Sequence, residues 1–245
     1  MIIEGKNVVF EALKSGQTFN KLFVAKTNRD EATQKVIDLA KSKGIRVDFV
    51  DKFLLDKKSQ TNHHQGIIAD VVEFEYSDID DILKLADERG ELPFIVLLDG
   101  IKDPHNLGAI IRSCECSGVH GIIIPKNRSV AVNETVIKTS AGAIANMKIA
   151  RVVNLNYTIA ELKQRGIWVY GFEAGEDIMY NCNLKGPIAV VIGSEGDGIS
   201  ELTKKKCDGI ISIPLSGRVN SLNASVACGI AVFEIVRQRN FNDKQ

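Results

Sequence analysis

Residues 188–200 read IAVVIGSEGDGIS, and this stretch says most about the fold. The apolar run 188–192 has the length of a buried strand. It leads into Gly193, Gly196 and Gly198, which let the backbone turn sharply and approach a ligand closely. The spacing G-x-x-G-x-G differs from the dinucleotide fingerprint G-x-G-x-x-G, and no acidic residue ends a second strand at the required interval. A nicotinamide-dependent oxidoreductase is therefore disfavoured.

The rest of the chain from residue 92 onward alternates short apolar runs with helical patterns. Unpatterned apolar strands between amphipathic helices indicate a parallel sheet covered on both faces, so the predicted fold class is α/β. The predicted strands are 94–98, 121–124, 168–171, 188–192 and 210–213. The predicted helices are 107–117, 133–141, 159–165, 200–205 and 222–239.

The first 72 residues predict a separate, small αβα unit. Helices are expected at 7–13 and 31–42, and strands at 21–25, 46–50 and 66–72. In the first helix, four apolar residues are expected to face inward: Val8, Val9, Ala12 and Leu13. Residues 73–91, EFEYSDIDDILKLADERGE, are interpreted as an acidic linker that contains a helix at about 79–86. The domains are therefore predicted as 1–72, 73–91 and 92–245.

Composition limits the possible classes of protein. The apolar fraction of 44% and charged fraction of 25% over 245 residues are typical of a globular protein. No apolar run is long enough for a membrane span and the N-terminus does not resemble a signal peptide, so no membrane partner is expected. The five cysteines include no C-x-x-C pair, which disfavours a disulfide framework or a metal site and favours a reducing cytoplasm.

The net charge of zero hides an uneven distribution. Residues 1–72 contain 12 Lys/Arg and 9 Asp/Glu, residues 73–91 contain 2 and 8, and residues 92–245 contain 17 and 14. The two outer segments are thus mildly basic, which permits an RNA partner without requiring one.

The segment 99–118, DGIKDPHNLGAIIRSCECSG, follows a predicted strand. An apolar stripe at i, i+3, i+4 and i+7 would face the core, and Asn106 lies in the turn that opens the helix. Arg112 lies off this stripe, near the strand ends where open α/β sheets bind ligands. The alternative is a capped helix with one solvated arginine.

Two further segments hold candidate polar residues. Glu195 lies inside the glycine loop, where a solvated acid is the alternative to a catalytic one. In 210–225, IISIPLSGRVNSLNAS, a strand ends, a loop follows and a long helix begins. Ser221 and Asn223 suit a helix N-cap by residue type, so a capping role is as well supported as a functional one.

Taken together, these segments resemble the SPOUT superfamily, and within it the TrmH-type RNA 2′-O-ribose methyltransferases. The resemblance covers about residues 92–240. It rests on DPHNLG at 103–108 with Arg112, GSEGDG at 193–198, IPLSG at 213–217 and NSLNAS at 220–225. The opening GKNVVFEAL at 5–13 resembles that of the RlmB-like branch, which methylates a guanosine in 23S ribosomal RNA.

The resemblance implies a C-terminal domain with a trefoil knot, a homodimer packed through that region, and an N-terminal RNA substrate-binding domain. It also implies S-adenosylmethionine as the cofactor, held largely by backbone groups at five positions: Ile192, Gly193, Ile213, Leu215 and Leu222. Apolar residues suit this task because they pack on the adenine while their amides and carbonyls bind its edge.

The resemblance assigns Arg112 to deprotonation of the ribose 2′-hydroxyl. Arginine side chains are almost entirely protonated at neutral pH, so Arg112 could instead orient the hydroxyl and a phosphate. Asn106 would position Arg112 or the ribose, and Glu195 would anchor the loop or Arg112. Ser221 and Asn223 would shape the pocket that the target ribose enters.

RNA would be held by lysines of the first domain, for which solvated surface is the alternative: Lys6, Lys14, Lys21, Lys26, Lys41 and Lys43. Three other functions remain open. They are a tRNA 2′-O-ribose methyltransferase, a resistance-type enzyme with another rRNA target, and a non-catalytic RNA-binding scaffold. The joint presence of the candidate catalytic residues argues against the scaffold.

Overall fold

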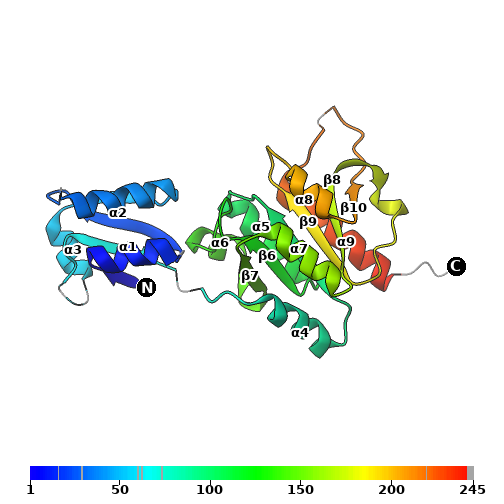
Figure 1. The fold of residues 1–245 in the computed structure, drawn as a ribbon, viewed down its shortest axis with the longest axis horizontal. Helices are drawn as coiled ribbons and strands as arrows, with labels where there is room; N and C mark the ends of the chain where they lie inside the picture. The colour runs from blue at the N-terminus through cyan, green and yellow to red at the C-terminus, as the bar shows by residue number, and fades with distance from the viewer. Residues whose placement is uncertain are drawn as a thin grey trace. The chain divides into compact units, whose positions relative to one another are not determined.

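The computed structural model describes residues 1–15, 17–28, 30–59, 61, 63–72, 74–218 and 220–241. The chain forms two compact units. The first comprises Met1–Glu75 with Val132–Glu134, and the second comprises Tyr76–Ala131 with Thr135–Gln245. Both units are α/β structures (Figure 1).

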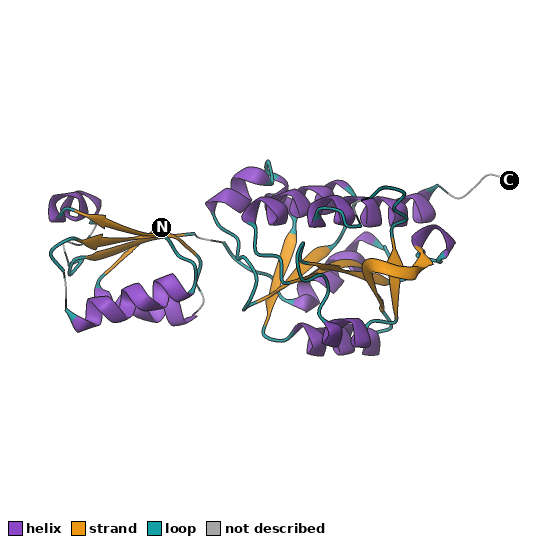
Figure 2. Ribbon diagram, turned by 90° about the horizontal axis from the view of Figure 1, so that it is seen from above, coloured by secondary structure: helices purple, strands orange, loops and turns teal. Residues whose placement is uncertain are grey.

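The first unit is a four-stranded sheet between helices. Its strands lie in the order β1-β4-β2-β3, with β1 and β4 antiparallel and β2 parallel to β3. Their bounds are β1 (Ile2–Glu4), β2 (Phe19–Ala25), β3 (Val47–Val50) and β4 (Ile67–Val71). The helices are α1 (Lys6–Ser15), α2 (Glu31–Ser42) and α3 (Lys52–Lys58). Figure 2 shows helices on both sides of this sheet, which agrees with the predicted αβα layering.

The two faces of this sheet are unequally covered. Helices α1 and α2 pack on one face over a large core that includes Val9, Leu13 and Val36. On the other face, only Leu55 of α3 joins a small core of strand residues. Val8 was expected to face inward but is 55% exposed, because it lies on the side of α1 away from that core. The sequence did not predict β1 or α3, which are three and seven residues long and too short to show a clear period.

The second unit contains a six-stranded, fully parallel sheet in the order β10-β8-β9-β5-β6-β7. Residues 94–98 at its centre are buried, with β9 on one side and β6 on the other. This confirms the predicted parallel α/β fold. The strands are β5 (Phe94–Asp99), β6 (Gly121–Pro125), β7 (Lys148–Val152), β8 (Trp168–Ile178), β9 (Ile188–Gly193) and β10 (Gly209–Ser212).

Helices cover both faces of this sheet (Figure 2). Ile82 of α4 and Ile159 of α7 share one core with β5, β6 and β9. Helices α5 and α9 pack on each other, and α9 also packs against β9. The helices are α4 (Ile79–Arg89), α5 (Pro104–Cys116), α6 (Glu134–Thr139), α7 (Leu155–Gln164), α8 (Glu201–Lys206) and α9 (Ala224–Asn240), with short 3₁₀ turns at Ala143–Asn146 and Met179–Asn181.

The expectation of a linker at 73–91 is corrected for most of that segment. Residues from Tyr76 onward belong to the second unit, and α4 buries Ile82 and Ala86 in it. The helix begins at a capping box in which the Asp78 amide donates to Asp81, and it ends at Gly90 in the left-handed region. The acidic residues occupy the solvent side and the first turn of a packed helix, so composition alone gave the wrong interpretation.

Strand β8 is longer than predicted and is irregular. Its pairing with β10 passes from Gly171–Ile210 directly to Asp177–Ile211, so residues 172–176 bulge out of the ladder. The sequence predicted only 168–171, because polar residues and Gly175 interrupt the apolar run. The bulge lies where the candidate site forms.

Candidate active site

The glycine loop after β9 is held closed by its own backbone. The Ser194 amide donates to the Gly198 carbonyl at 3.1 Å, and the Gly198 amide donates to the Ser194 carbonyl at 3.0 Å. A Cβ on Gly193 would lie 2.2 Å from the Gly198 carbonyl carbon, so no other residue fits there. Gly198 adopts a φ of +65°. A Cβ on Gly196 meets nothing within 4 Å, so the predicted loop depends on the first and third glycines.

Acidic side chains fix the far end of this loop. Glu173, in the β8 bulge, accepts a hydrogen bond from the Ile199 amide at 2.9 Å and pairs with Lys204 at 2.7 Å. Hydrogen bonding to Glu173 and Glu201 raises the Lys204 pKa. Asp99, at the end of β5, accepts from the Ser200 amide at 2.9 Å. The loop is thus tied to two strands of the sheet.

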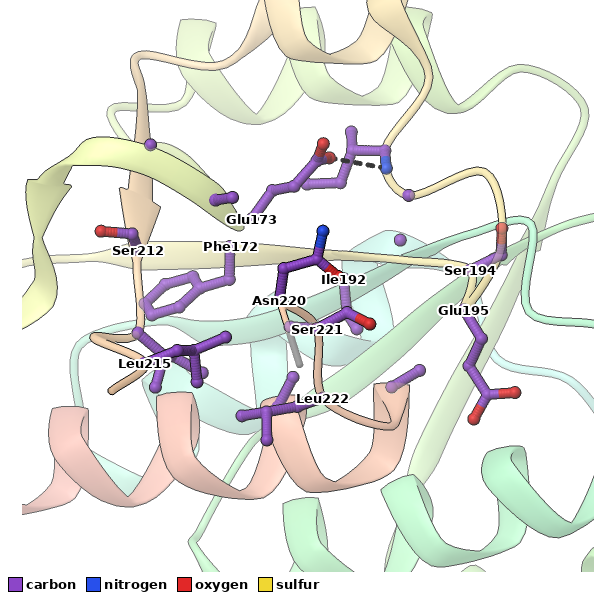
Figure 3. A pocket seen from close by; sticks show the side chains of 18 of the residues that line it. Phe172, Glu173, Ile192, Ser194, Glu195, Ser212, Leu215, Asn220, Ser221 and Leu222 are labelled. Carbon is purple, nitrogen blue, oxygen red and sulfur yellow. Dashed lines mark hydrogen bonds between the residues drawn. The ribbon is translucent and has the colours of Figure 1, made fainter. Parts of the chain in front are cut away.

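A cavity of about 770 Å³ opens between this loop, the β8 bulge and the segment that leads into α9. Its lining includes all five positions expected to hold the cofactor: Ile192, Gly193, Ile213, Leu215 and Leu222. Glu195 and Ser221 also line it. Figure 3 shows Phe172, Leu215 and Leu222 lying together, with Glu195 set apart from them. The cavity therefore has an apolar part and a separate polar end.

A hydrogen-bonded cluster joins three of the predicted catalytic residues. The Asn106 amide donates to Glu195 Oε1 at 3.0 Å, and the Asn223 amide donates to Asn106 Oδ1 at 3.0 Å and also to Glu195. Asn223 Oδ1 accepts from the Ser225 amide at 3.0 Å and so caps α9. Asn223 therefore caps α9 and also belongs to the cluster, so the two roles that the sequence left as alternatives are compatible. The cluster links α5, the glycine loop and α9.

Arg112 is placed differently. It is exposed on α5 and is absent from the lining of the cavity. Within the described residues, no carboxylate lies within ion-pair distance of its guanidinium. The structure therefore brings together Asn106, Glu195 and Asn223, but does not bring Arg112 to them. Its catalytic role stays a prediction.

The sequence did not predict several residues that line the cavity, among them Phe172, Glu173 and Ser212. Phe172 and Glu173 follow the end of a predicted strand, and this position at the carboxyl edge of a parallel sheet was the available signal. Ser212 lies at the end of β10, and its hydroxyl donates to the Asp177 carbonyl at 3.1 Å. The sequence could not show that Phe172 and Glu173 lie close to the glycine loop, because their position depends on the β8 bulge.

Two general features of the described residues bear on function. No group of three or more His, Cys, Asp and Glu side chains gathers there in a way that could hold a metal ion. None of the helices in the same part of the chain is long and apolar enough to cross a membrane.

Residues 93–233 match the SpoU rRNA Methylase family, and residues 2–77 match the family described as RNA 2′-O ribose methyltransferase substrate binding. The chain belongs to the SpoU/TrmH family of RNA methyltransferases. The two matched regions correspond to the two compact units of the fold.

Known proteins similar to the chain agree with this. A Bacillus subtilis protein named as a TrmH family tRNA/rRNA methyltransferase is 47% identical over 96% of this chain and 95% of its own length. The SpoU methyltransferase AviRb of Streptomyces viridochromogenes, solved with AdoMet, is 24% identical, with a TM-score of 0.62 over 97% of this chain and 90% of its own. An A. aeolicus TrmH/SpoU tRNA modifying enzyme is 29% identical, with a TM-score of 0.55 over 60% of this chain and 76% of its own.

Proposed function

We propose that this protein transfers a methyl group from S-adenosylmethionine to the ribose 2′-hydroxyl of a guanosine in 23S ribosomal RNA. The observation that carries the proposal is the convergence of the five cofactor positions on one cavity whose polar end contains Glu195. The Asn106–Glu195–Asn223 cluster lies at that residue, so candidate catalytic groups and candidate cofactor groups belong to one site.

The residues of the cavity fit this cofactor. Phe172, Leu215 and Leu222 offer an apolar surface for an adenine ring, and the backbone of the glycine loop and of 213–215 supplies donors and acceptors for polar edges. Gly193 and Gly198 allow the loop to close tightly without side chains. When bound, S-adenosylmethionine would supply an electrophilic methyl group.

The chain's own residues would align the acceptor and remove its proton. Asn106 and Asn223 both donate hydrogen bonds to Glu195, and these bonds hold its carboxylate in one position. Arg112 is exposed, so its guanidinium is available to an RNA phosphate or ribose. Because arginine stays protonated near neutral pH, we favour Arg112 as the group that orients the hydroxyl rather than the base.

The choice of ribosomal RNA rests on the first unit. Its match to a substrate-binding family and its opening GKNVVFEAL support the RlmB-like branch. A tRNA substrate is the second candidate, favoured by the tRNA modifying enzyme above, although that likeness covers only 60% of this chain.

The test is methyl transfer from labelled S-adenosylmethionine to unmodified large-subunit rRNA and, separately, to unmodified tRNA. We expect label in a 2′-O-methylguanosine of the rRNA alone. Label in tRNA alone would keep the chemistry and overturn the substrate. Intact cofactor binding with no label in either RNA would favour a non-catalytic RNA-binding scaffold.

We also propose a homodimer and a trefoil knot. Helix α9 exposes Val226 and Phe233 with Ile230 half-buried between them, which suits a face covered by a second copy. Light scattering of the wild type and of Phe233→Glu tests the dimer, which we expect only in the wild type.

The chain path after β10 supports the knot. Strand β10 lies at the sheet edge, but α9, which follows it, packs against β9, so the chain returns toward the middle of the sheet as a knot requires.

We place the enzyme in the cytoplasm. All five cysteines are free thiols, and burial raises the Cys114 pKa. Free thiols and an RNA substrate both fit a reducing compartment.

A further inference from the structure

Helix α3 of the first unit presents apolar side chains to solvent. Of its three apolar residues, only Leu55 is buried, whereas Phe53 is 68% exposed and Leu54 is 39% exposed. A helix that served only to cover the sheet would gain stability by turning its phenylalanine inward. The exposed ring is therefore available to contact a partner.

Lysines accompany aromatic rings on this side of the sheet. Lys57 Nζ lies 4.7 Å from the centroid of Phe53. Lys58 and Lys21 lie 4.8 Å and 5.3 Å from the centroid of Phe23, whose ring belongs to the small core beneath α3. The α3 face is defined here as Lys21, Phe53, Lys57 and Lys58. It combines one open ring with three ammonium groups.

The lysines of the α3 face keep their positive charge uncompensated. Among the described residues, no carboxylate lies within 4.0 Å of Lys21, Lys57 or Lys58. In contrast, three of the lysines that the sequence singled out for RNA are paired with acids: Lys6 with Asp30, Lys14 with Glu11 and Lys26 with Asp51. In the part of the chain that the structure describes, Lys41 and Lys43 of that set have no acid within 4.0 Å either, so the unpaired lysines of this unit include those of the α3 face and those at the end of α2.

We infer that the α3 face binds single-stranded or loop RNA, with Phe53 stacking on one unpaired base and the three lysines contacting phosphates. This inference rests on the proposed function, because it names the class of RNA that the first unit would hold. An exposed aromatic ring binds any base through its π-face, and flanking cations follow the backbone. Duplex RNA keeps its base faces stacked and would leave Phe53 without a partner.

The composition of the face selects RNA over other partners. One open ring and one partly exposed leucine offer too little apolar surface for a stable protein interface or for insertion into a bilayer. The uncompensated lysines match a polyanion instead. Because Lys57 already lies over one side of the Phe53 ring, a base would stack on the side that remains open.

The test uses the full chain and a short single-stranded RNA that carries 5-iodouridine. Binding is measured by fluorescence anisotropy at several salt concentrations, and contact is mapped by photocrosslinking and mass spectrometry. Phe53→Ala should weaken binding about tenfold or more and abolish the crosslink at residue 53. Phe53→Tyr should retain both. Lys57→Gln should weaken binding and reduce the salt slope by about one.

Two matched controls lie elsewhere in the same unit. Phe49→Ala removes a ring that is 51% exposed on β3 and that, by strand alternation, shares the face of Val47 and α2. Lys35→Gln removes an exposed lysine of α2. Neither variant should change binding by more than about twofold, and thermal unfolding should be unchanged in all variants, since the replaced side chains are exposed.

If Phe53→Ala binds RNA as tightly as the wild type, and the wild type transfers methyl groups, this inference is overturned and the proposed function still holds. Weakened binding by Lys35→Gln instead of Lys57→Gln would place RNA on the α2 face. Binding to anionic vesicles that depends on Phe53, with RNA binding unaffected, would identify a membrane face. A wild-type chain that neither binds nor methylates RNA would overturn the proposed function itself.

Discussion

The glycine loop with its cavity and the surface around Arg112 are built in opposite ways. In the loop, backbone hydrogen bonds, Glu173 and Asp99 hold the chain in place, and Gly193 leaves no room for a side chain. Arg112 projects from α5 into solvent, outside the cavity lining. Both regions come from the motifs that carry the family resemblance, yet only the glycine loop lines the cavity.

This difference indicates a division of labour. A cofactor of fixed shape is best bound by a preorganised site, and the loop has that character. An RNA substrate carries negatively charged phosphates, and an exposed arginine without an internal ion-pair partner can bind one of them. Cofactor binding and catalysis should therefore respond separately to substitution.

The largest effect is expected for Arg112→Ala. Turnover should fall on the order of 10³-fold, because the acceptor hydroxyl would lose the group that we propose to orient it. The affinity for S-adenosylmethionine should be unchanged, because Arg112 does not line the cavity. Calorimetry with the cofactor and single-turnover methyl transfer provide the two readouts. The control is Cys116→Ala, at an exposed position on the same helix. A parallel loss of cofactor affinity in Arg112→Ala would show that Arg112 also contributes to cofactor binding.

Gly193→Ala should have the next largest effect. The new Cβ would overlap the Gly198 carbonyl carbon at 2.2 Å, so the loop must open and cofactor affinity should fall on the order of 100-fold. Gly196→Ala is the matched control, since its Cβ meets open space. Equal affinities in the two variants, measured by calorimetry, would show that loop closure does not form the cofactor site.

Glu173→Gln should have a smaller effect on the same cavity. The carboxylate that accepts from the Ile199 amide and pairs with Lys204 is lost, and cofactor affinity should fall about fivefold. Glu201→Gln removes only the more exposed partner of Lys204 and should leave affinity near that of the wild type. The reverse order of effects would show that the Lys204 charge matters more than the position of the loop.

The smallest effect concerns stability and lies outside both regions. Burial lowers the pKa of His120, whose Nδ1 accepts a hydrogen bond from the Phe94 amide at 3.0 Å. Since the pKa of His120 is lower in the folded state than in the unfolded state, the stability that neutral His120 contributes is fully present above about pH 6.5. This contribution declines as the pH falls below that value. Urea unfolding should therefore show a loss of free energy below that pH in the wild type. His120→Gln should reduce this dependence, and an unchanged pH profile would contradict the assignment.

Long apolar patterns predicted five of the six strands described in the parallel sheet, all except β7. The combined motifs, through the family resemblance, predicted the cavity residues Ile192, Gly193 and Leu222. Features that depend on contacts between distant segments were not predictable. The bulge at 172–176 depends on how β8 meets β10, so Glu173 was missed. The packing of Ile82 reversed the linker interpretation, and ion pairs such as Lys6–Asp30 changed which lysines are free.

The identity of the methylated product tests the proposed chemistry most directly. The chain is incubated with labelled S-adenosylmethionine and unmodified RNA, and the RNA is digested with alkali, which cannot cleave beside a 2′-O-methylated ribose. We expect the label in alkali-resistant dinucleotides. Label recovered only on a base, in alkali-sensitive mononucleotides, would show that this site does not methylate a ribose hydroxyl.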